Sequence, residues 1–205
     1  MTLNEIVNKT FEKVKVFNTR LLLPALRESD KEPFQDELWN GPMNTNGCAL
    51  YVFSICLVDL IKPKQVVELG GAMGMWSLCV LHSLPAESKL YSITLEEGGL
   101  EFKFVVDKYL NFHPIIGDDL DMKNWEGIDL LNTDIWYFDS IHSYDQLTKE
   151  LNLYSPYFKK GALLLFDDIH QDEGMERAWL EIQGQYETMD LTDPCHWTGW
   201  SIAQV

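Results

Sequence analysis

The chain has 205 residues, 46% of them hydrophobic, which suits one compact domain with a sizeable core and excludes a disordered chain. Its formal net charge of −16 would repel phosphate backbones and anionic lipid surfaces, so we expect no nucleic acid and no membrane among its partners and favour a small molecule. No apolar run approaches the roughly 20 residues of a membrane span, and residues 1–15 are too charged for a secretory signal, so we expect a cytoplasmic protein.

The N-terminal part of the chain is predicted to form a helical cap or lid. Residues 3–26 carry apolar side chains at near-helical spacing, and a polar, irregular stretch follows at residues 27–46. A helix is then predicted from Thr45 or Asn46 to Leu60. We therefore expect a single domain over residues 1–205, with the cap at residues 1–46 and the core at residues 47–205.

A glycine-rich turn follows the first predicted strand, which contains Glu68. Gly70, Gly71 and Gly74 then precede a helix predicted at residues 75–84. Glycines let the backbone turn sharply and approach a ligand closely, and a helix start offers unpaired N–H groups, so Glu68 and the three glycines are candidate cofactor-binding residues. The turn lacks the glycine spacing of a dinucleotide fingerprint and the lysine of a phosphate-binding loop. Nicotinamide cofactors and nucleoside triphosphate hydrolysis are therefore disfavoured.

Strands and helices are predicted to alternate regularly beyond the glycine turn. Strands are expected at residues 89–95, 113–116, 134–138 and 162–166, and helices at residues 100–110, 144–153 and 173–182. Two further strands, at residues 186–191 and 199–205, are joined by a turn at residues 193–194. This alternation is typical of an α/β fold with a doubly wound, mainly parallel sheet.

Acidic residues lie at the ends of three predicted strands. Glu68 ends the first strand, Asp139 directly follows the strand at residues 134–138, and Asp167 and Asp168 follow the strand at residues 162–166. In an open parallel sheet the carboxyl ends of the strands meet at one edge, where ligands collect. Neighbouring strands lie ~4.8 Å apart, so acids of two strands can share a hard cation such as Mg²⁺. The alternative is that these acids cap the following helices or are solvated.

Two groups of motifs resemble a known enzyme family. The pattern Glu68-x-Gly70-x-x-x-Gly74 resembles the first motif of class I S-adenosylmethionine-dependent methyltransferases. With it, Asp139-x-x-His142-x-Tyr144 and the later run that ends in Asp167-Asp168 look like metal-dependent small-molecule O-methyltransferases, of the catechol type and the macrolide-sugar tailoring type. The resemblance covers about residues 64–168.

The resemblance implies a Rossmann-like methyltransferase fold, with a seven-stranded sheet whose last strand runs antiparallel. It also implies S-adenosylmethionine as the cofactor, with Gly70 and Gly74 facing its methionine part. Asp139, Asp167 and Asp168 would bind a divalent metal, with Mg²⁺ the expected ion. Asp139 is also a candidate cofactor-binding residue.

One position departs from the family's pattern. The acid that usually grips the ribose hydroxyls at the end of the second strand would fall at Thr94, but Glu96 lies two residues later and on the same face of a continued strand. We assign Glu96 to the ribose. Asp118 occupies the place where relatives have an acid near the adenine, although it could instead belong to a solvated acidic turn.

The implied reaction is direct methyl transfer to a hydroxyl of a small-molecule metabolite. The sulfonium carbon is already activated, so the protein must align the acceptor oxygen with it. The metal would bind substrate oxygens and lower the pKa of the acceptor hydroxyl. Asp139 and His142 are the candidate catalytic residues, because either of them could accept the proton.

Two alternatives stay open at this point. A metal-dependent oxygenase or hydroxylase on the same fold would use the same acids with His142. A non-catalytic cofactor-binding protein would have kept the sheet and lost the chemistry, and the missing acid at Thr94 favours that reading. We also allow for a homo-oligomer of this chain.

Overall fold

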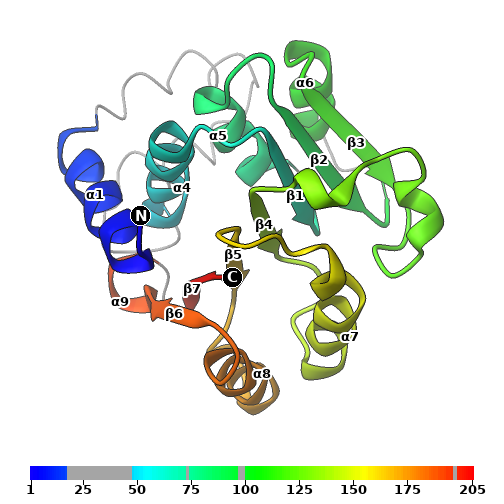
Figure 1. The fold of residues 1–205 in the computed structure, drawn as a ribbon. Helices are drawn as coiled ribbons and strands as arrows, with labels where there is room; N and C mark the ends of the chain where they lie inside the picture. Colours follow the sequence, from blue (N-terminus) through cyan, green and yellow to red (C-terminus); the bar gives the residue numbers. More distant parts are fainter. Residues whose placement is uncertain (18–47, 73, 97–99, 196–197) are drawn as a thin grey trace.

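The computed structural model describes residues 1–17, 48–72, 74–96, 100–195 and 198–205 (Figure 1). Seven strands form one sheet in the order β3-β2-β1-β4-β5-β7-β6. The strands are β1 (Gln65–Leu69), β2 (Lys89–Thr94), β3 (Phe112–Ile116), β4 (Ile135–Phe138), β5 (Leu163–Asp167), β6 (Glu187–Asp190) and β7 (Trp200–Gln204). All neighbouring pairs are parallel except that β7 runs antiparallel to both β5 and β6. The predicted doubly wound, seven-stranded sheet with an antiparallel last strand is confirmed.

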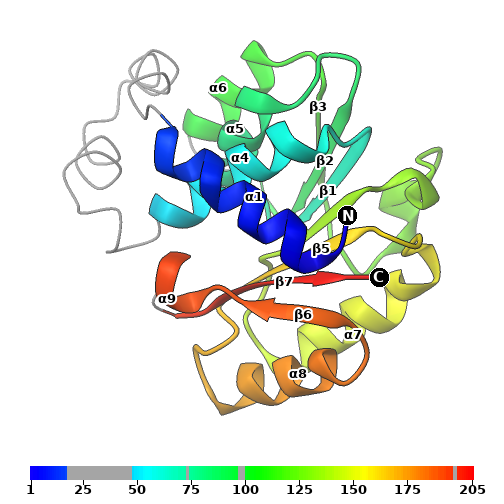
Figure 2. The same cartoon turned by 60° about the vertical axis from the view of Figure 1, so that its left-hand side comes forward.

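Helices cover both faces of this sheet. In the described residues the α-helices are α1 (Leu3–Val16), α4 (Cys48–Ile61), α5 (Met75–Ser83), α6 (Leu100–Lys108), α7 (Tyr144–Tyr154), α8 (Glu173–Gln183) and α9 (Thr192–Cys195). The same part of the chain contains the short 3-10 helices η2 (Met122–Trp125), η3 (Leu130–Asn132) and η4 (Ser155–Tyr157). The core on one face includes residues of α1, α4, α5 and α6, and the core on the other includes residues of α7 and α8. Figure 2 shows α1 lying beside α4 on the first of these faces.

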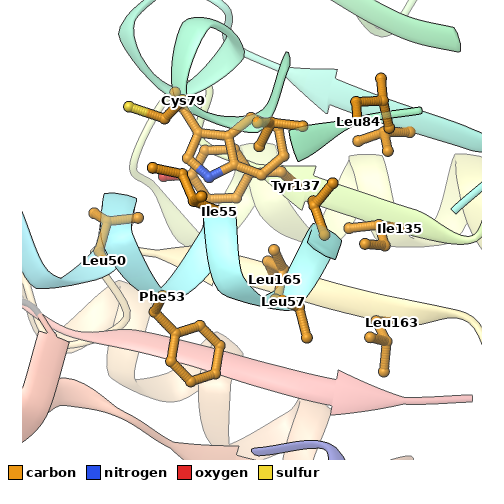
Figure 3. Close-up of a cluster of buried hydrophobic side chains, with 14 of the residues drawn as sticks. Leu50, Phe53, Ile55, Leu57, Cys79, Leu84, Ile135, Tyr137, Leu163 and Leu165 are labelled. Carbon is orange, nitrogen blue, oxygen red and sulfur yellow. The ribbon is translucent and has the colours of Figure 1, made fainter. Parts of the chain in front are cut away.

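The strands at the centre of the sheet are buried on both sides. Every residue of β1 and β5 is buried, as the continuous apolar runs of the sequence predict. Because successive side chains of a strand point to opposite faces, Val66 packs in one core and Val67 in the other. Figure 3 shows the first core, where Phe53 of α4 and Tyr137 of β4 lie among aliphatic side chains.

Polar side chains define where the helices beside the sheet's carboxyl edge begin. Ser143 accepts a hydrogen bond from the backbone N–H of Gln146 at the start of α7, at 3.3 Å. Asp172 accepts one from the backbone N–H of Met175 at the start of α8, at 2.9 Å. Such caps satisfy backbone donors that have no partner within the helix. They hold the loops after β4 and β5 in place, and these loops carry the predicted site residues.

The predicted elements agree with the structure in type and order. One local difference is at residues 193–194, where a turn is predicted and the short helix α9 is found; proline is compatible with a first helical turn. Residues 18–47 lie outside the described residues, so the division into cap and core stays a prediction. Within the described part of the chain, no helix combines the length and apolar character that a membrane span requires.

Candidate active site

The glycine turn brings the end of β1 against the end of β4. Gly70 has a φ of +94°, and a Cβ atom at this position would lie 1.9 Å from the backbone oxygen of Asp139. Its N–H and that of Gly71 both donate to the carbonyl oxygen of Ile93, at 2.9 and 3.0 Å. Only glycine fits this approach, because any side chain would collide with backbone. The turn therefore brings the backbone of Asp139 directly against Gly70.

The start of α5 is free of side-chain caps. Gly74 occupies the N-cap position with a φ of +77° and offers no side chain to bond the first-turn N–H groups. Uncapped N–H groups at a helix N-terminus favour an anionic or polar ligand group. This is the environment that the sequence predicts for Gly70, Gly71 and Gly74.

A cavity of about 720 Å³ lies at the carboxyl ends of β1, β2, β3 and β4. This volume is in the range of pockets that hold small molecules. Four predicted cofactor-binding residues line it together: Gly70, Glu96, Asp118 and Asp139. Thr94, the position where the family's acid is missing, lines it as well. The predicted residues Glu68, Gly71 and Gly74 are not part of its lining.

Sequence reasoning did not find three polar residues of the cavity lining. Asp119, Ser140 and Gln146 come from the loop after β3, the loop after β4 and the first turn of α7. Their positions carry no motif that separates them from ordinary loop or helix residues. They meet only because the parallel strands bring these three segments to one edge.

The cavity is strongly acidic. Its lining carries four carboxylates, those of Glu96, Asp118, Asp119 and Asp139, and among the described lining residues there is no lysine, arginine or histidine. One of these acids has a local structural task as well, since Asp118 Oδ1 accepts a hydrogen bond from the N–H of Leu120 at 2.9 Å. The summed negative potential favours a ligand with a positive charge.

Glu68 lies behind the glycine turn. Its side chain is 1% exposed and accepts a hydrogen bond from the hydroxyl of Ser77 on α5. Burial raises the pKa of Glu68 to about 7, and the hydrogen bond from Ser77 opposes the rise. Glu68 thus ties β1 to the first turn of α5, and its direct contact with a cofactor stays a prediction.

The two predicted catalytic residues are in contact. His142 Nε2 lies 3.0 Å from Asp139 Oδ1, and the other ring nitrogen, Nδ1, lies 2.6 Å from Asp168 Oδ2. The hydrogen bonds to Asp139 and Asp168 raise the pKa of His142 to about 10, against the effect of burial. At neutral pH the imidazole is therefore protonated and donates to both carboxylates.

The three aspartates predicted to bind a metal have other partners. Asp167 accepts hydrogen bonds from the Tyr137 hydroxyl and from the N–H of Asp168, both at 3.0 Å. Asp168, in the left-handed region with a φ of +54°, accepts from the hydroxyl of Thr198 and pairs with His142. No group of three or more His, Cys, Asp or Glu side chains among the described residues is arranged to hold a metal ion. The arrangement does not support the predicted Mg²⁺ site of Asp139, Asp167 and Asp168, because the imidazole occupies the place between the first and the last.

Known proteins share this fold and part of this sequence. A family model described as a methyltransferase domain matches residues 67–169, which is half of the chain. No curated protein sequence matches the chain. The crystal structure of cofactor-bound Rv0187 from MTB is similar over 97% of this chain and 95% of that one, with 16% identity and a TM-score of 0.65.

Two further solved structures are similar over nearly their whole length. The O-methyltransferase TomG from Streptomyces achromogenes, in complex with SAM, covers 100% of this chain and 99% of its own, with 16% identity and a TM-score of 0.61. An O-methyltransferase from Bacillus cereus, in complex with SAH, covers 100% of both chains, with 13% identity and a TM-score of 0.62. At these identities the likeness shows a common fold.

Replacing Gly70 with alanine should destabilise the protein by at least about 3 kcal/mol, because the new methyl group adds a collision with the Asp139 backbone to the cost of a left-handed φ. Gly127→Ala is the matched control, since Gly127 also has a positive φ, +81°, but no atom within 4 Å of the added Cβ. We expect the control to lose about 1–2 kcal/mol. Denaturant unfolding measures both, and equal losses would contradict the close approach.

Replacing Glu68 with glutamine should flatten the pH dependence of stability. The pKa of Glu68 is about 7 in the folded protein and near 4.5 in the unfolded chain, so Glu68 ionises in the unfolded chain first as pH rises. The free energy of unfolding therefore falls between these two pKa values and levels off above about pH 7. Between pH 5 and pH 8 the free energy of unfolding of the unmodified protein should fall about 2 kcal/mol more than that of Glu68→Gln. The exposed Glu187→Gln serves as the control, and identical slopes for all three proteins would refute the neutral, buried Glu68.

Proposed function

The chain belongs to the methyltransferase domain family, and we propose that it transfers a methyl group from S-adenosylmethionine to a hydroxyl group of a small-molecule metabolite. The observation that carries the proposal is the acidic cavity at the ends of β1 to β4, which opens beside the paired residues Asp139 and His142. S-adenosylmethionine carries a sulfonium cation, which matches the negative lining. The similar structures with bound SAM and SAH add support for the cofactor.

The proposed placement of the cofactor follows the strand ends. Its methionine part would lie against Gly70 and the uncapped start of α5, whose N–H groups suit its carboxylate. Glu96 reaches the cavity from beyond β2 and would accept hydrogen bonds from the ribose hydroxyls, as the sequence predicts. Asp118, after β3, would lie near the adenine. This order leaves the sulfonium close to Asp139.

Asp139 is the residue we propose as the proton acceptor. His142 donates from both ring nitrogens and stays protonated at neutral pH, so it has no free lone pair for the proton of the acceptor hydroxyl. Asp139 lines the cavity, and burial raises its pKa above that of an ordinary aspartate, which makes it a stronger base. His142 would then orient Asp139 and balance its charge, while the attacking oxygen is aligned with the sulfonium methyl group.

The metal implied by the resemblance is left out of this scheme. The carboxylates that would bind it are engaged by His142, Tyr137 and Thr198, so the side chains as arranged do not fit a divalent ion. For the same reason we do not favour the metal-dependent oxygenase or hydroxylase. A non-catalytic role rested on the missing acid at Thr94, and the presence of Glu96 in the cavity lining weakens it.

Asp139→Asn should reduce methyl transfer by about 10²- to 10⁴-fold, because the amide cannot accept the proton, while S-adenosylmethionine binding changes by less than about tenfold. The assay is transfer of labelled methyl groups to a panel of phenolic and sugar acceptors, with binding followed by calorimetry. Asp107→Asn, at an exposed position on α6, is the control and should match the unmodified protein. Absence of S-adenosylmethionine binding by the unmodified protein would refute the proposed function.

Methyl transfer should persist in EDTA, because the cation beside Asp139 and Asp168 is the protonated imidazole of His142. The rate is measured after extensive chelation and again after Mg²⁺ is restored. A rate that disappears with EDTA and returns with Mg²⁺ would show that the aspartates rearrange around a metal and would overturn the scheme.

A further inference from the structure

A partly buried acid–amide cluster, made of Asp119, Ser140, Gln146 and Glu150, borders the cavity near the end of β3. Three of its members line the cavity, and Glu150 lies behind them, 1% exposed. The carboxyl groups of Asp119 and Glu150 both accept hydrogen bonds from the amide of Gln146, and Ser140 donates its hydroxyl proton to Glu150. The scheme proposed for methyl transfer gives this cluster no role.

The cluster fixes the orientation of the Gln146 side chain. Its amide nitrogen donates one hydrogen bond to Asp119 Oδ1, at 3.0 Å, and one to Glu150 Oε1, at 2.8 Å. A primary amide has two N–H donors, so both are used on the buried acids. The opposite orientation would turn the amide oxygen towards carboxyl oxygens. Because Gln146 lines the cavity, its Oε1 atom, an acceptor, is what remains to meet a ligand.

We propose that Gln146 recognises the 6-amino group of the cofactor's adenine, and that Asp119 and Glu150 are the positioning residues that hold its amide for this contact. The proposal rests on the proposed function, since it assumes that an S-adenosyl compound occupies the cavity. It assigns the choice of nucleobase to the first turn of α7.

The surroundings of Gln146 suit a purine ring. The methyl group must be delivered beside Asp139, so the nucleoside part of the cofactor extends away from it, towards the loop after β3. Leu95, Leu120 and Ile141 line this cavity, and Leu95 and Ile141 are 66% and 58% exposed in the absence of a ligand. Apolar side chains of this kind pack against the faces of a planar base, while a fixed acceptor reads its edge.

The protonation of the cluster agrees with this arrangement. Burial raises the pKa of Glu150 to about 8, with a further contribution from the charge of Asp119, so Glu150 is mostly protonated at neutral pH. The other titratable groups that face the pair are Asp118 and Tyr154, and Tyr154 donates to the backbone oxygen of Asp119. A protonated Glu150 still accepts from Gln146 through its carbonyl oxygen, so the amide keeps its orientation.

The contact predicts a strong preference for adenine over hypoxanthine. Hypoxanthine has a carbonyl oxygen in place of the 6-amino group, and this oxygen would face the fixed oxygen of Gln146 with no proton between them. A site built to accept a hydrogen bond rejects an analogue that cannot donate it. The preference can be measured without turnover, by comparing S-adenosylhomocysteine with its deaminated analogue S-inosylhomocysteine.

The experiment is calorimetric titration of both compounds into the unmodified protein and its variants. The unmodified protein should bind S-adenosylhomocysteine at least about tenfold more tightly than S-inosylhomocysteine. Gln146→Leu keeps the side-chain volume but removes the acceptor, and its ratio should fall below about threefold. Gln185→Leu, at an exposed position after α8, is the matched control and should keep the ratio.

Variants of Glu150 test its positioning role. Glu150→Gln mimics the protonated acid, because its amide oxygen can still accept from Gln146, so it should keep the preference for adenine. Glu150→Leu removes one of the two acceptors that hold the amide of Gln146 and should weaken the preference, in protein whose circular dichroism confirms folding. An unchanged ratio in Gln146→Leu would overturn the inference about Gln146 but would not contradict the proposed methyl transfer. Failure of the unmodified protein to bind S-adenosylhomocysteine would overturn the proposed function and the inference with it.

Discussion

The approach of Gly70 to the backbone of Asp139 is the contact on which the site depends. It lets the turn after β1 pass against the end of β4 with no side chain between them. The same turn leads into α5, whose start has no side-chain cap, while Gly70 and Asp139 line one cavity. The register of β1 with its parallel neighbours β2 and β4 then places Glu96 and the loop after β4 around the same opening.

Two buried acids, Glu68 and Glu150, connect the elements that carry the site. Glu68 and Glu150 are both 1% exposed, and burial raises the pKa of each towards or above neutrality. Each accepts hydrogen bonds from side chains of neighbouring elements, Ser77 for Glu68 and Ser140 and Gln146 for Glu150. Burying an unpaired charge would destabilise the folded state, whereas a neutral acid with hydrogen-bond partners can link two segments without a large desolvation penalty. Buried acids of this chain therefore connect neighbouring elements behind the site, while other acids line the cavity.

The sequence predicts the elements of the fold well, because apolar runs such as Ala162–Phe166 and turns such as that at Gly70 report local structure directly. It also predicts Asp139 and His142, three positions apart in one loop, as candidate catalytic residues, and the structure shows the two side chains in contact. It fails where side-chain direction depends on partners far along the chain. Tyr137 donates to Asp167 and Thr198 donates to Asp168, and no sequence motif predicts these hydrogen bonds. Gln146 was missed because its task arises from contact with the loop after β3.

The acidic lining of the cavity has a consequence for turnover. A sulfonium compound enters with a positive charge on sulfur and leaves, after the methyl group has gone, as an uncharged thioether. The four carboxylates of the lining therefore attract the charged methyl donor more strongly than the uncharged thioether product. The reaction itself thus removes part of the electrostatic attraction that holds the cofactor in the cavity. Concentrated salt screens this attraction. The ratio of donor affinity to product affinity should therefore rise as ionic strength falls, and product inhibition should weaken.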